Sequence, residues 1–399
     1  MAMDSIPDED KDLRSILEMN LDGLDTLGVE DSSFRPAGPA EPMTLEKRMA
    51  GSARLQRLQA QWEKGQAGDG PSGLPLNRGL VQIEPAERTL TYKATVVKTW
   101  DSAVQDAKGV YDLICLGELA SLSQVRTLVG SFLEVLEKDR NILLALCLYQ
   151  SPNLAEYLYR HAVNMCLVSL AAAAASGYSK GQVLEIGQAA LLADLGMTMV
   201  PEAILLKAGK LTEEELAEIH RHPANSFALL EKVQDVSDYV LAAAYQHHER
   251  LTGAGYPKRR SQAQISQVAR IVAISDTLCA MVHKRSHRDA LTPQMALDKV
   301  IKMGQMNFLD PVLIRNLLRY LSVYPIGTYV ELASGRMGRV VAAHPEDPTR
   351  PVISILRNEK GLPLPMKQIL QVDLFKEKNE KIAKVVDGEA EKFRPLDGF

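Results

Sequence analysis

The segment Tyr245–Pro257, Y-Q-H-H-E-R-L-T-G-A-G-Y-P, decides how the rest of the chain is interpreted. The adjacent pair His247-His248 follows the apolar run Val240–Ala244, which predicts the end of a buried helix. The glycines and the proline that follow predict a tight turn. Two imidazoles at a helix end beneath a rigid loop suit a metal site, although neighbours on a helix point about 100° apart. Surface histidines before a turn remain the alternative, so the pair needs support from other residues.

The composition is that of an ordinary globular protein and excludes several classes of partner. A chain of 399 residues is long enough for two or three domains, and the formal net charge of −4 gives no reason to expect nucleic acid. No apolar run reaches the ~18 residues of a membrane span, and the acidic N-terminus does not resemble a signal peptide. The four cysteines lie far apart in apolar patterns, which favours buried free thiols in a reducing cytosol. We therefore expect a cytoplasmic location, no membrane span and no nucleic-acid partner.

The patterns divide the chain into five segments. We expect a flexible N-terminal segment with a short amphipathic helix (1–73), a regulatory module (74–150), a helical domain (151–323), a small β extension (324–375) and a loose, charged tail (376–399). The amphipathic helix is predicted by apolar residues at near-helical spacing, namely Leu45, Met49, Leu55, Leu58 and Trp62.

Strand-like and helical patterns alternate between these segments. In the regulatory module the β-rich runs 80–83, 90–97 and 110–116 predict strands, and 118–148 predicts a helix. In the helical domain His161–Ser176 predicts a central buried helix, and Thr212 with Glu215 predicts a capped helix start. Pro293 is predicted at a first helical turn. The short β runs 328–332, 338–343 and 351–356 predict the β extension.

Potential metal ligands recur in the helical domain at intervals of roughly one helix plus its connection. They are His161, Asp194, His222, His247, His248 and Asp276. Asp194 and Asp276 interrupt apolar helix patterns, where a carboxylate needs a partner because burying it bare is costly. Each residue taken singly also fits a structural role, such as a paired carboxylate or a core histidine. Together they predict a metal site built by several helices.

The ligand types indicate the metal and the chemistry. Mixed imidazole and carboxylate ligands fit iron, manganese or zinc, and argue against calcium. If Asp194 bridged two ions about 3.5–4 Å apart, the ions would activate a water nucleophile and clamp a phosphodiester. Arg285 and Arg288 would lie about three turns beyond Asp276 if that helix continued, where they could bind phosphate oxygens. A basic helix end that favours the helix dipole is the alternative for these arginines.

From about His161 to Arg288 the chain resembles the HD-GYP subgroup of HD-superfamily phosphodiesterases, which hydrolyse the bacterial second messenger cyclic di-GMP. The resemblance rests on His161, A-L-L-A-D-L-G-M-T-M-V-P at Ala190–Pro201, H-P at 222–223, the H-H-E…G-A-G-Y-P segment, and R-I-V-A-I-S-D at Arg270–Asp276. It covers about half the chain, and the strand-rich end resembles the β extension of relatives. It implies a mainly α fold, an HD-superfamily helical bundle with a small α/β N-terminal module and a small C-terminal β extension.

The resemblance also implies a role for each site residue. His161 and Asp276 would hold one metal together with the His-Asp doublet of the family. His222, His247 and His248 would hold the other, with Asp194 as the bridging, catalytic residue. Arg285 and Arg288 fall where the family binds substrate phosphate, and Tyr256 of the glycine-rich turn is the third candidate for substrate binding.

The chain departs from the family pattern at four positions. Ala193 replaces the histidine of the His-Asp doublet, so one metal position loses a ligand. Met197 stands where the family has a lysine near the scissile phosphate, Cys279 where a second aspartate is common, and Thr252 where the loop commonly has aspartate. Losing one group that stabilises charge in a transition state typically costs ~10²–10³ in rate. Because the ligand at 193 is missing, one metal site is expected rather than two.

These residues together predict a degenerate HD-GYP-type signalling protein of bacterial cyclic di-GMP pathways. It would be inactive or strongly impaired as a phosphodiesterase and would act by binding a partner protein and, as a further option, cyclic di-GMP. Two alternatives stay open: an active phosphodiesterase with an altered metal centre, and a scaffold that one ion stabilises. A homodimer is also left open.

Overall fold

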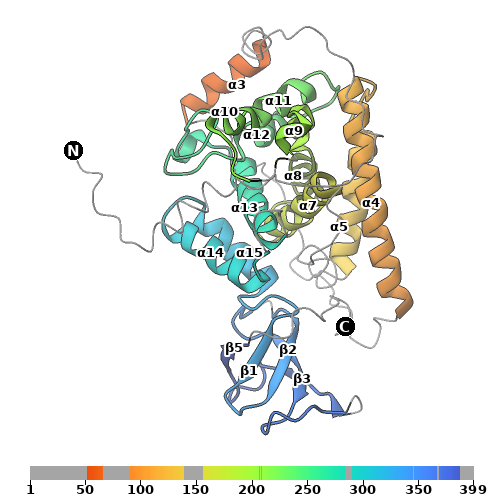
Figure 1. Ribbon diagram of the computed structural model, residues 1–399, viewed down its shortest axis with the longest axis vertical. Helices are drawn as coiled ribbons and strands as arrows, with labels where there is room; N and C mark the ends of the chain where they lie inside the picture. Colours follow the sequence, from red (N-terminus) through yellow and green to blue (C-terminus); the bar gives the residue numbers. More distant parts are fainter. Residues whose placement is uncertain are drawn as a thin grey trace, which may run out of the picture.

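The computed structural model describes residues 52–65, 90–138, 156–205, 207, 209–283, 290–344, 346–365 and 368–386. In Figure 1 these residues form a helical body, with a small antiparallel sheet below helices α14 (Pro293–Gln305) and α15 (Pro311–Leu321). The expected mainly α fold with an HD-superfamily helical bundle is confirmed.

Four helices form the centre of the body. They are α7 (Tyr157–Ala175), α8 (Lys180–Leu192), α12 (Asp238–Gln246) and α13 (Gln267–Val282). α7 is apolar around almost its whole circumference, and small buried side chains at Ala171–Ala173 let neighbouring helices approach closely. By length and composition α7 is the one described helix that could cross a membrane, but 78% of that window is buried inside the fold. α7 is therefore the central buried helix that the sequence predicts.

Shorter helices connect these four. They are η4 (Leu195–Met199), α9 (Glu202–Leu205), α10 (Glu213–Ile219), α11 (His222–Leu230) and η5 (Gln262–Gln264). The predicted cap of α10 is confirmed, because Thr212 and Glu215 bond each other's backbone N–H groups. Pro293 also starts α14 as predicted.

The N-terminal module differs from the sequence expectation. The strands predicted at 90–97 and 110–116 are wrong, because both runs lie in one long helix, α4 (Leu90–Leu116). The run 80–83 lies outside the described residues. The helix predicted at 118–148 is present over part of that range, as α5 (Ser123–Lys138), and 139–148 lie outside the described residues.

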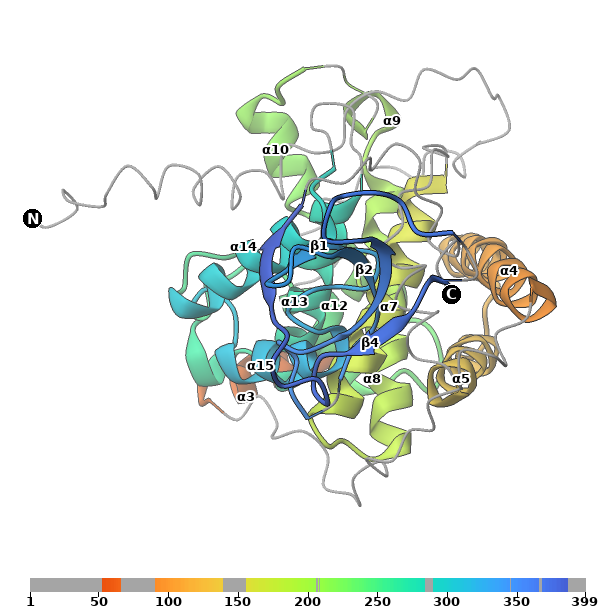
Figure 2. The same cartoon turned by 90° about the horizontal axis from the view of Figure 1, so that it is seen from below.

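Packing explains why α4 is a helix despite its β-branched residues. Its buried side chains recur every three or four residues along one face: Trp100, Ala103, Val104, Ala107, Val110, Tyr111 and Ile114. This stripe belongs to the same hydrophobic core as α7, α8 and α13. α4 and α5 therefore share one core with the helical domain, and Figure 2 shows them side by side along its flank.

The predicted amphipathic helix of the N-terminal segment is present as α3 (Ala53–Glu63). Leu55, Leu58 and Trp62 are buried as expected, whereas 45 and 49 lie outside the described residues. Trp62 stacks on Tyr245 of α12 at 6.0 Å between ring centroids. α3 thus packs on the body of this chain, against α12, the helix that ends directly before the histidine pair.

The C-terminal sheet has five antiparallel strands in the order β4-β3-β2-β1-β5. The strands are β1 (Tyr329–Leu332), β2 (Met337–Ala342), β3 (Val352–Arg357), β4 (Gln371–Asp373) and β5 (Ile382–Val385). The first three match the predicted β runs. The expectation of a loose tail from 376 is wrong for β5, which pairs with β1 and extends the sheet beyond 375.

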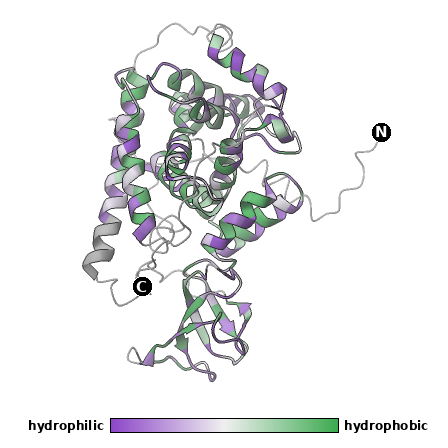
Figure 3. Cartoon of the chain, turned by 180° about the vertical axis from the view of Figure 1, so that it is seen from behind, coloured by the Kyte–Doolittle hydropathy of each residue, from purple (hydrophilic) through white to green (hydrophobic). Residues whose placement is uncertain are grey.

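The sheet has a small core of its own, separate from that of the helices. The colouring of Figure 3 shows hydrophobic residues along the helices of the body and in the strands of the sheet, and the buried ones form the two cores. Of the cysteines described, Cys166 and Cys279 are buried free thiols as expected, but Cys115 is exposed.

Candidate metal centre

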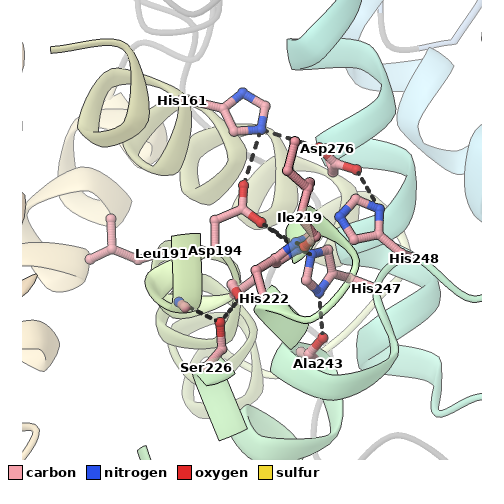
Figure 4. A network of polar contacts seen from close by, with 12 residues as sticks. His161, Leu191, Asp194, Ile219, His222, Ser226, Ala243, His247, His248 and Asp276 are labelled. Atoms are coloured by element: carbon pink, nitrogen blue, oxygen red, sulfur yellow. Dashed lines mark hydrogen bonds and ion pairs between the residues drawn. The ribbon is translucent and has the colours of Figure 1, made fainter. Parts of the chain in front are cut away.

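Five segments bring the six predicted ligands together in the middle of the helical body (Figure 4). His161 lies on α7, Asp194 between α8 and η4, His222 at the start of α11, the pair His247-His248 directly after α12, and Asp276 on α13. All six residues are buried, with relative exposures of 7% or less. Residues up to 115 positions apart in the sequence therefore meet in one interior site.

The six residues form two clusters that share Asp194. The histidine-rich cluster contains Asp194, His222, His247 and His248, and the carboxylate-rich cluster contains His161, Asp194 and Asp276. Within each cluster the ligand atoms lie within 4.8 Å of one another. The two oxygens of Asp194 divide between the clusters: Oδ1 faces the histidine-rich cluster and Oδ2 faces His161.

The histidine-rich cluster has the dimensions of a metal coordination sphere. Asp194 Oδ1 lies 3.2 Å from Nε2 of His247 and 3.4 Å from Nε2 of His222, and the two Nε2 atoms are 3.4 Å apart. For bonds of about 2.0–2.1 Å, neighbouring ligands on a tetrahedral ion are about 3.3–3.4 Å apart. These three atoms therefore fit one face of a tetrahedron around a divalent ion.

Backbone carbonyls orient the two imidazoles. Nδ1 of His222 donates to the carbonyl of Ile219 at 2.8 Å, and Nδ1 of His247 donates to the carbonyl of Ala243 at 2.9 Å. A carbonyl only accepts, so the proton lies on Nδ1 and Nε2 is directed at the cluster. This is the arrangement by which proteins fix the tautomer of a metal-binding histidine.

The carboxylate-rich cluster is closed by direct contacts. His161 Nε2 lies 3.1 Å from Asp276 Oδ1 and 3.5 Å from Asp194 Oδ2. Asp276 Oδ2 and Nδ1 of His248 are buried without a hydrogen-bond partner among the described residues, and they lie 3.5 Å apart. Buried polar atoms of this kind call for a partner, and a cation between the clusters would supply one. The residues present therefore fit a divalent ion.

The electrostatics of the site also favour a cation. Burial alone would raise the pKa of Asp194, but hydrogen bonds and charge from His222 and His247 hold that pKa well below its usual range. Burial likewise opposes charge on His247, yet Asp194 raises the pKa of that imidazole above its usual value. The pKa of His248 is well below the usual value because of burial and the neighbouring imidazoles. The cluster thus holds an ionised carboxylate that is best neutralised by a proton on His247 or by a metal in its place.

A close contact between η4 and α11 fixes the position of Asp194. A Cβ atom on Gly196 would lie 2.2 Å from the carbonyl of His222, so only glycine allows this approach. Ser226 Oγ donates to the carbonyl of Ala193 at 2.7 Å and accepts from the backbone N–H of Gly196 at 2.7 Å. Neither Gly196 nor Ser226 was selected from the sequence, although a glycine two residues after a candidate ligand could have indicated Gly196.

The glycine-rich loop folds back over the histidine pair. Both oxygens of Glu249 accept backbone N–H groups of the loop, from Lys258 and Arg260, at 2.8 Å each. A Cβ atom on Gly255 would lie 2.3 Å from the carbonyl of His248, so the loop requires glycine there. The loop ends in a cis Tyr256–Pro257 peptide bond.

Tyr256, the third predicted substrate-binding residue, lies against the histidine-rich cluster. Its ring stacks on His248 at 4.6 Å and on His220 at 4.1 Å between centroids. The three rings form one stack that begins at His248 of the histidine-rich cluster. His220 is a neighbour of the site that sequence analysis did not select.

His220 is expected to make the metal-free protein sensitive to acid. Burial, with a contribution from His222, lowers the pKa of His220 from 6.5 to about 4. Below pH 6.5 the imidazole binds a proton in the unfolded chain but not in the folded chain. The contribution of His220 to stability therefore falls between pH 6.5 and about pH 4 and does not change further below pH 4. His220→Gln should reduce the loss of unfolding free energy between pH 7 and pH 4 by about 1–2 kcal/mol, after allowing for solvent screening at a half-buried ring.

Urea unfolding of chelator-treated protein at several pH values measures this effect. His344→Gln is the matched control, because His344 lies beyond β2, where it stacks on Phe375. Equal pH slopes for His220→Gln and the parent protein would show that the ring titrates normally in the folded state.

The positions that depart from the family pattern are buried in apolar surroundings, with one exception. Ala193 is fully buried at the end of α8, and Met197 packs with Val200 and Ile219 in a small apolar cluster. Cys279 is fully buried, and burial raises the pKa of its thiol well above the usual value. Cys279 belongs to neither of the two clusters of potential ligands among the described residues. Thr252 is exposed.

The helix expected to carry the two predicted phosphate-binding arginines is shorter than the sequence suggests. α13 ends at Val282, so the continuous helix assumed for them does not extend as far as 285. Arg285 and Arg288 themselves lie outside the described residues.

Comparisons with known proteins agree with this fold. Residues 152–313 match the family model described as an HD domain, and 329–393 match a KOW domain associated with HD domains. The chain is 31% identical to the cyclic di-GMP phosphodiesterase PA4108 of Pseudomonas aeruginosa over 285 residues, which are 71% of this chain and 67% of that protein. The chain belongs to the HD-GYP family of HD-domain proteins.

Two further relatives carry the same kind of name. The cyclic di-GMP phosphodiesterase response regulator RpfG of Xanthomonas campestris is 35% identical over 203 residues, 50% of this chain and 52% of that protein. The cyclic di-GMP phosphodiesterase PdeB of Borreliella burgdorferi is 26% identical over 214 residues, 53% of this chain and 56% of that protein. The chain thus spans about half the length of these two relatives.

Proposed function

We propose that this protein acts in cyclic di-GMP signalling as a metal-binding HD-GYP protein whose phosphodiesterase activity is lost or strongly impaired. The observation that supports this proposal is the difference between the two clusters of the site. The histidine-rich cluster has four candidate ligands, three of which fit one face of a tetrahedral ion. The carboxylate-rich cluster has one imidazole and, at the position of the family's second imidazole, the fully buried Ala193.

The residues of the histidine-rich cluster would hold the ion. Asp194 also belongs to the carboxylate-rich cluster, so it would connect the two clusters. A bound divalent ion would supply a Lewis acid for a phosphodiester. The chain's own residues orient and neutralise the site: the carbonyls of Ile219 and Ala243 orient two imidazoles, and Asp194 provides the negative charge. Met197, at the position of the family's lysine, supplies no charge to a substrate phosphate.

This chemistry supports an effector role. A site that binds cyclic di-GMP without consuming it would report the concentration of the messenger, and a partner protein would receive that signal. Binding to the folded state also stabilises it in proportion to ligand concentration.

A second candidate is an active phosphodiesterase with an altered metal centre. The observation that favours it is that His161, Asp194 and Asp276 still converge within 4.8 Å. Three ligands with water in the remaining positions are the usual form of a catalytic metal site.

Calorimetric titration with cyclic di-GMP, with metal content measured on the same sample, tests the proposal. We expect about one ion per chain, binding of cyclic di-GMP, and hydrolysis at least ~10²-fold below ordinary turnover of ~1–10³ s⁻¹. Ordinary turnover would contradict the effector role and support the second candidate.

His247→Gln should lose the ion, and His344→Gln, on the β extension, should keep it.

A further inference from the structure

The carboxyl end of α8 is the backbone from which Asp194 emerges. The last carbonyl groups of a helix have no partner within the helix and must be satisfied from outside. Here the carbonyl of Leu191 accepts a hydrogen bond from the Tyr111 hydroxyl at 2.7 Å, and the carbonyl of Ala193 accepts one from Ser226 at 2.7 Å. Side chains from two other helices, α4 and α11, therefore hold the turn that presents Asp194.

Tyr111 comes from the N-terminal helix α4, 80 positions before its partner in the sequence. The residue is fully buried and packs edge-on against Tyr159 of α7 at 5.6 Å between ring centroids. Burial and the charge of Asp194 raise the pKa of its hydroxyl well above the usual value. The hydroxyl therefore keeps its proton and remains a hydrogen-bond donor.

A second contact from the same face of α4 lies one turn further along. The Cys115 thiol lies 3.2 Å from Thr198 Oγ1 of η4, and the Thr198 hydroxyl donates to the carbonyl of Leu195 at 2.7 Å. Because that hydroxyl proton is already used, the thiol is the donor to Thr198. α4 thus contacts the chain on both sides of Asp194, at 191 and at 198.

We propose that Tyr111 is a positioning residue for the metal site, acting through the Leu191 carbonyl on Asp194. This inference rests on the proposed metal-binding function. Asp194 is the one residue common to both clusters, and its oxygens must meet partners 3.2–3.5 Å away on α7, α11 and the end of α12. Metal sites require ligand placement to within about 0.5 Å, so a shift of this turn weakens binding at both clusters.

The competing explanation is that the Tyr111 hydroxyl contributes only to overall stability. A buried carbonyl left without its donor destabilises any fold, whether or not a metal site is nearby. The two explanations differ in what the variant changes. A positioning role changes the affinity and the coordination of the ion, and a stability role changes the melting temperature alone.

The experiment uses Tyr111→Phe in the full chain, with Mn²⁺ as the probe. Calorimetry gives the Kd for Mn²⁺, electron paramagnetic resonance gives the symmetry of the bound ion, and melting curves of chelated protein give stability. We expect an approximately tenfold weaker Kd and an altered Mn²⁺ spectrum, which corresponds to about 1.4 kcal/mol of binding free energy. Tyr159→Phe is the matched control, because it removes a hydroxyl from the adjacent ring and leaves the Leu191 carbonyl bonded.

A second variant, Thr198→Val, keeps the shape of the side chain but removes the hydroxyl on the other side of Asp194. It should weaken the Kd severalfold. It keeps the test decisive if Tyr111→Phe is poorly folded. Parent-like Kd and spectrum in Tyr111→Phe, or in Thr198→Val when that variant has to stand in, would overturn the inference while leaving the proposed function intact. Failure of the parent protein to bind Mn²⁺, Fe²⁺ or Zn²⁺ would instead overturn the proposed function, and the inference with it.

Discussion

Asp194→Asn is expected to weaken metal binding by a factor of about 10²–10³. The substitution keeps the size of the side chain and removes the carboxylate that contacts His161, His222 and His247. Removing one partner from a buried charged cluster typically costs about 3–5 kcal/mol, and the lower part of this range, about 3–4 kcal/mol, corresponds to a factor of about 10²–10³ in affinity. Titration of chelated protein with Mn²⁺ or Zn²⁺ measures the change directly.

The matched control is Asp347→Asn, which removes a carboxylate from a turn of the β extension, where Asp347 bonds Thr349. Its metal affinity should equal that of the parent protein. If Asp194→Asn also kept that affinity, the ion would bind elsewhere, and the shared role of Asp194 between the two clusters would be wrong.

Ala193→His is expected to increase the number of bound ions from about one to two per chain. The new imidazole would stand at the family's His-Asp doublet, next to the cluster of His161, Asp194 and Asp276. If its absence is what impairs the enzyme, hydrolysis of cyclic di-GMP should rise by about 10²–10³. Metal analysis and a hydrolysis assay on the same preparation measure both effects.

Ala193 is fully buried, so a larger side chain also carries a packing cost of about 1–3 kcal/mol. Ala193→Leu is the matched control, because leucine adds comparable volume without a metal ligand. An already active parent that gains little from Ala193→His would support the second candidate, the phosphodiesterase with an altered centre. Unchanged metal content in a folded Ala193→His variant would contradict the explanation based on the missing ligand.

Local sequence patterns predicted most of the helical domain. Apolar periodicity, the capping pair Thr212 and Glu215, and Pro293 at a helix start each act within a few residues, so the sequence displays them directly. The strands predicted at 90–97 and 110–116 were wrong because β propensity is weaker than packing. The stripe from Trp100 to Ile114 buries one face of α4 in the common core, and that burial selects the helix.

The candidate site was predictable to a similar degree. Histidines and carboxylates in apolar segments are costly unless they meet a partner, so the six ligand positions could be selected from the sequence. Gly196, Ser226 and Tyr111 could not be selected in this way, because each acts through a contact with a segment far along the chain. The metal-binding role of the six residues remains a proposal.

Residue types and short-range spacing were enough to predict the family and the helical class and to select six candidate metal ligands. The tertiary structure alone decided that α4 belongs to the main core and that Asp194 faces two clusters. It also decided which carbonyls hold the ligands in place. These features depend on distances between segments up to 115 residues apart, and packing of the whole chain sets those distances.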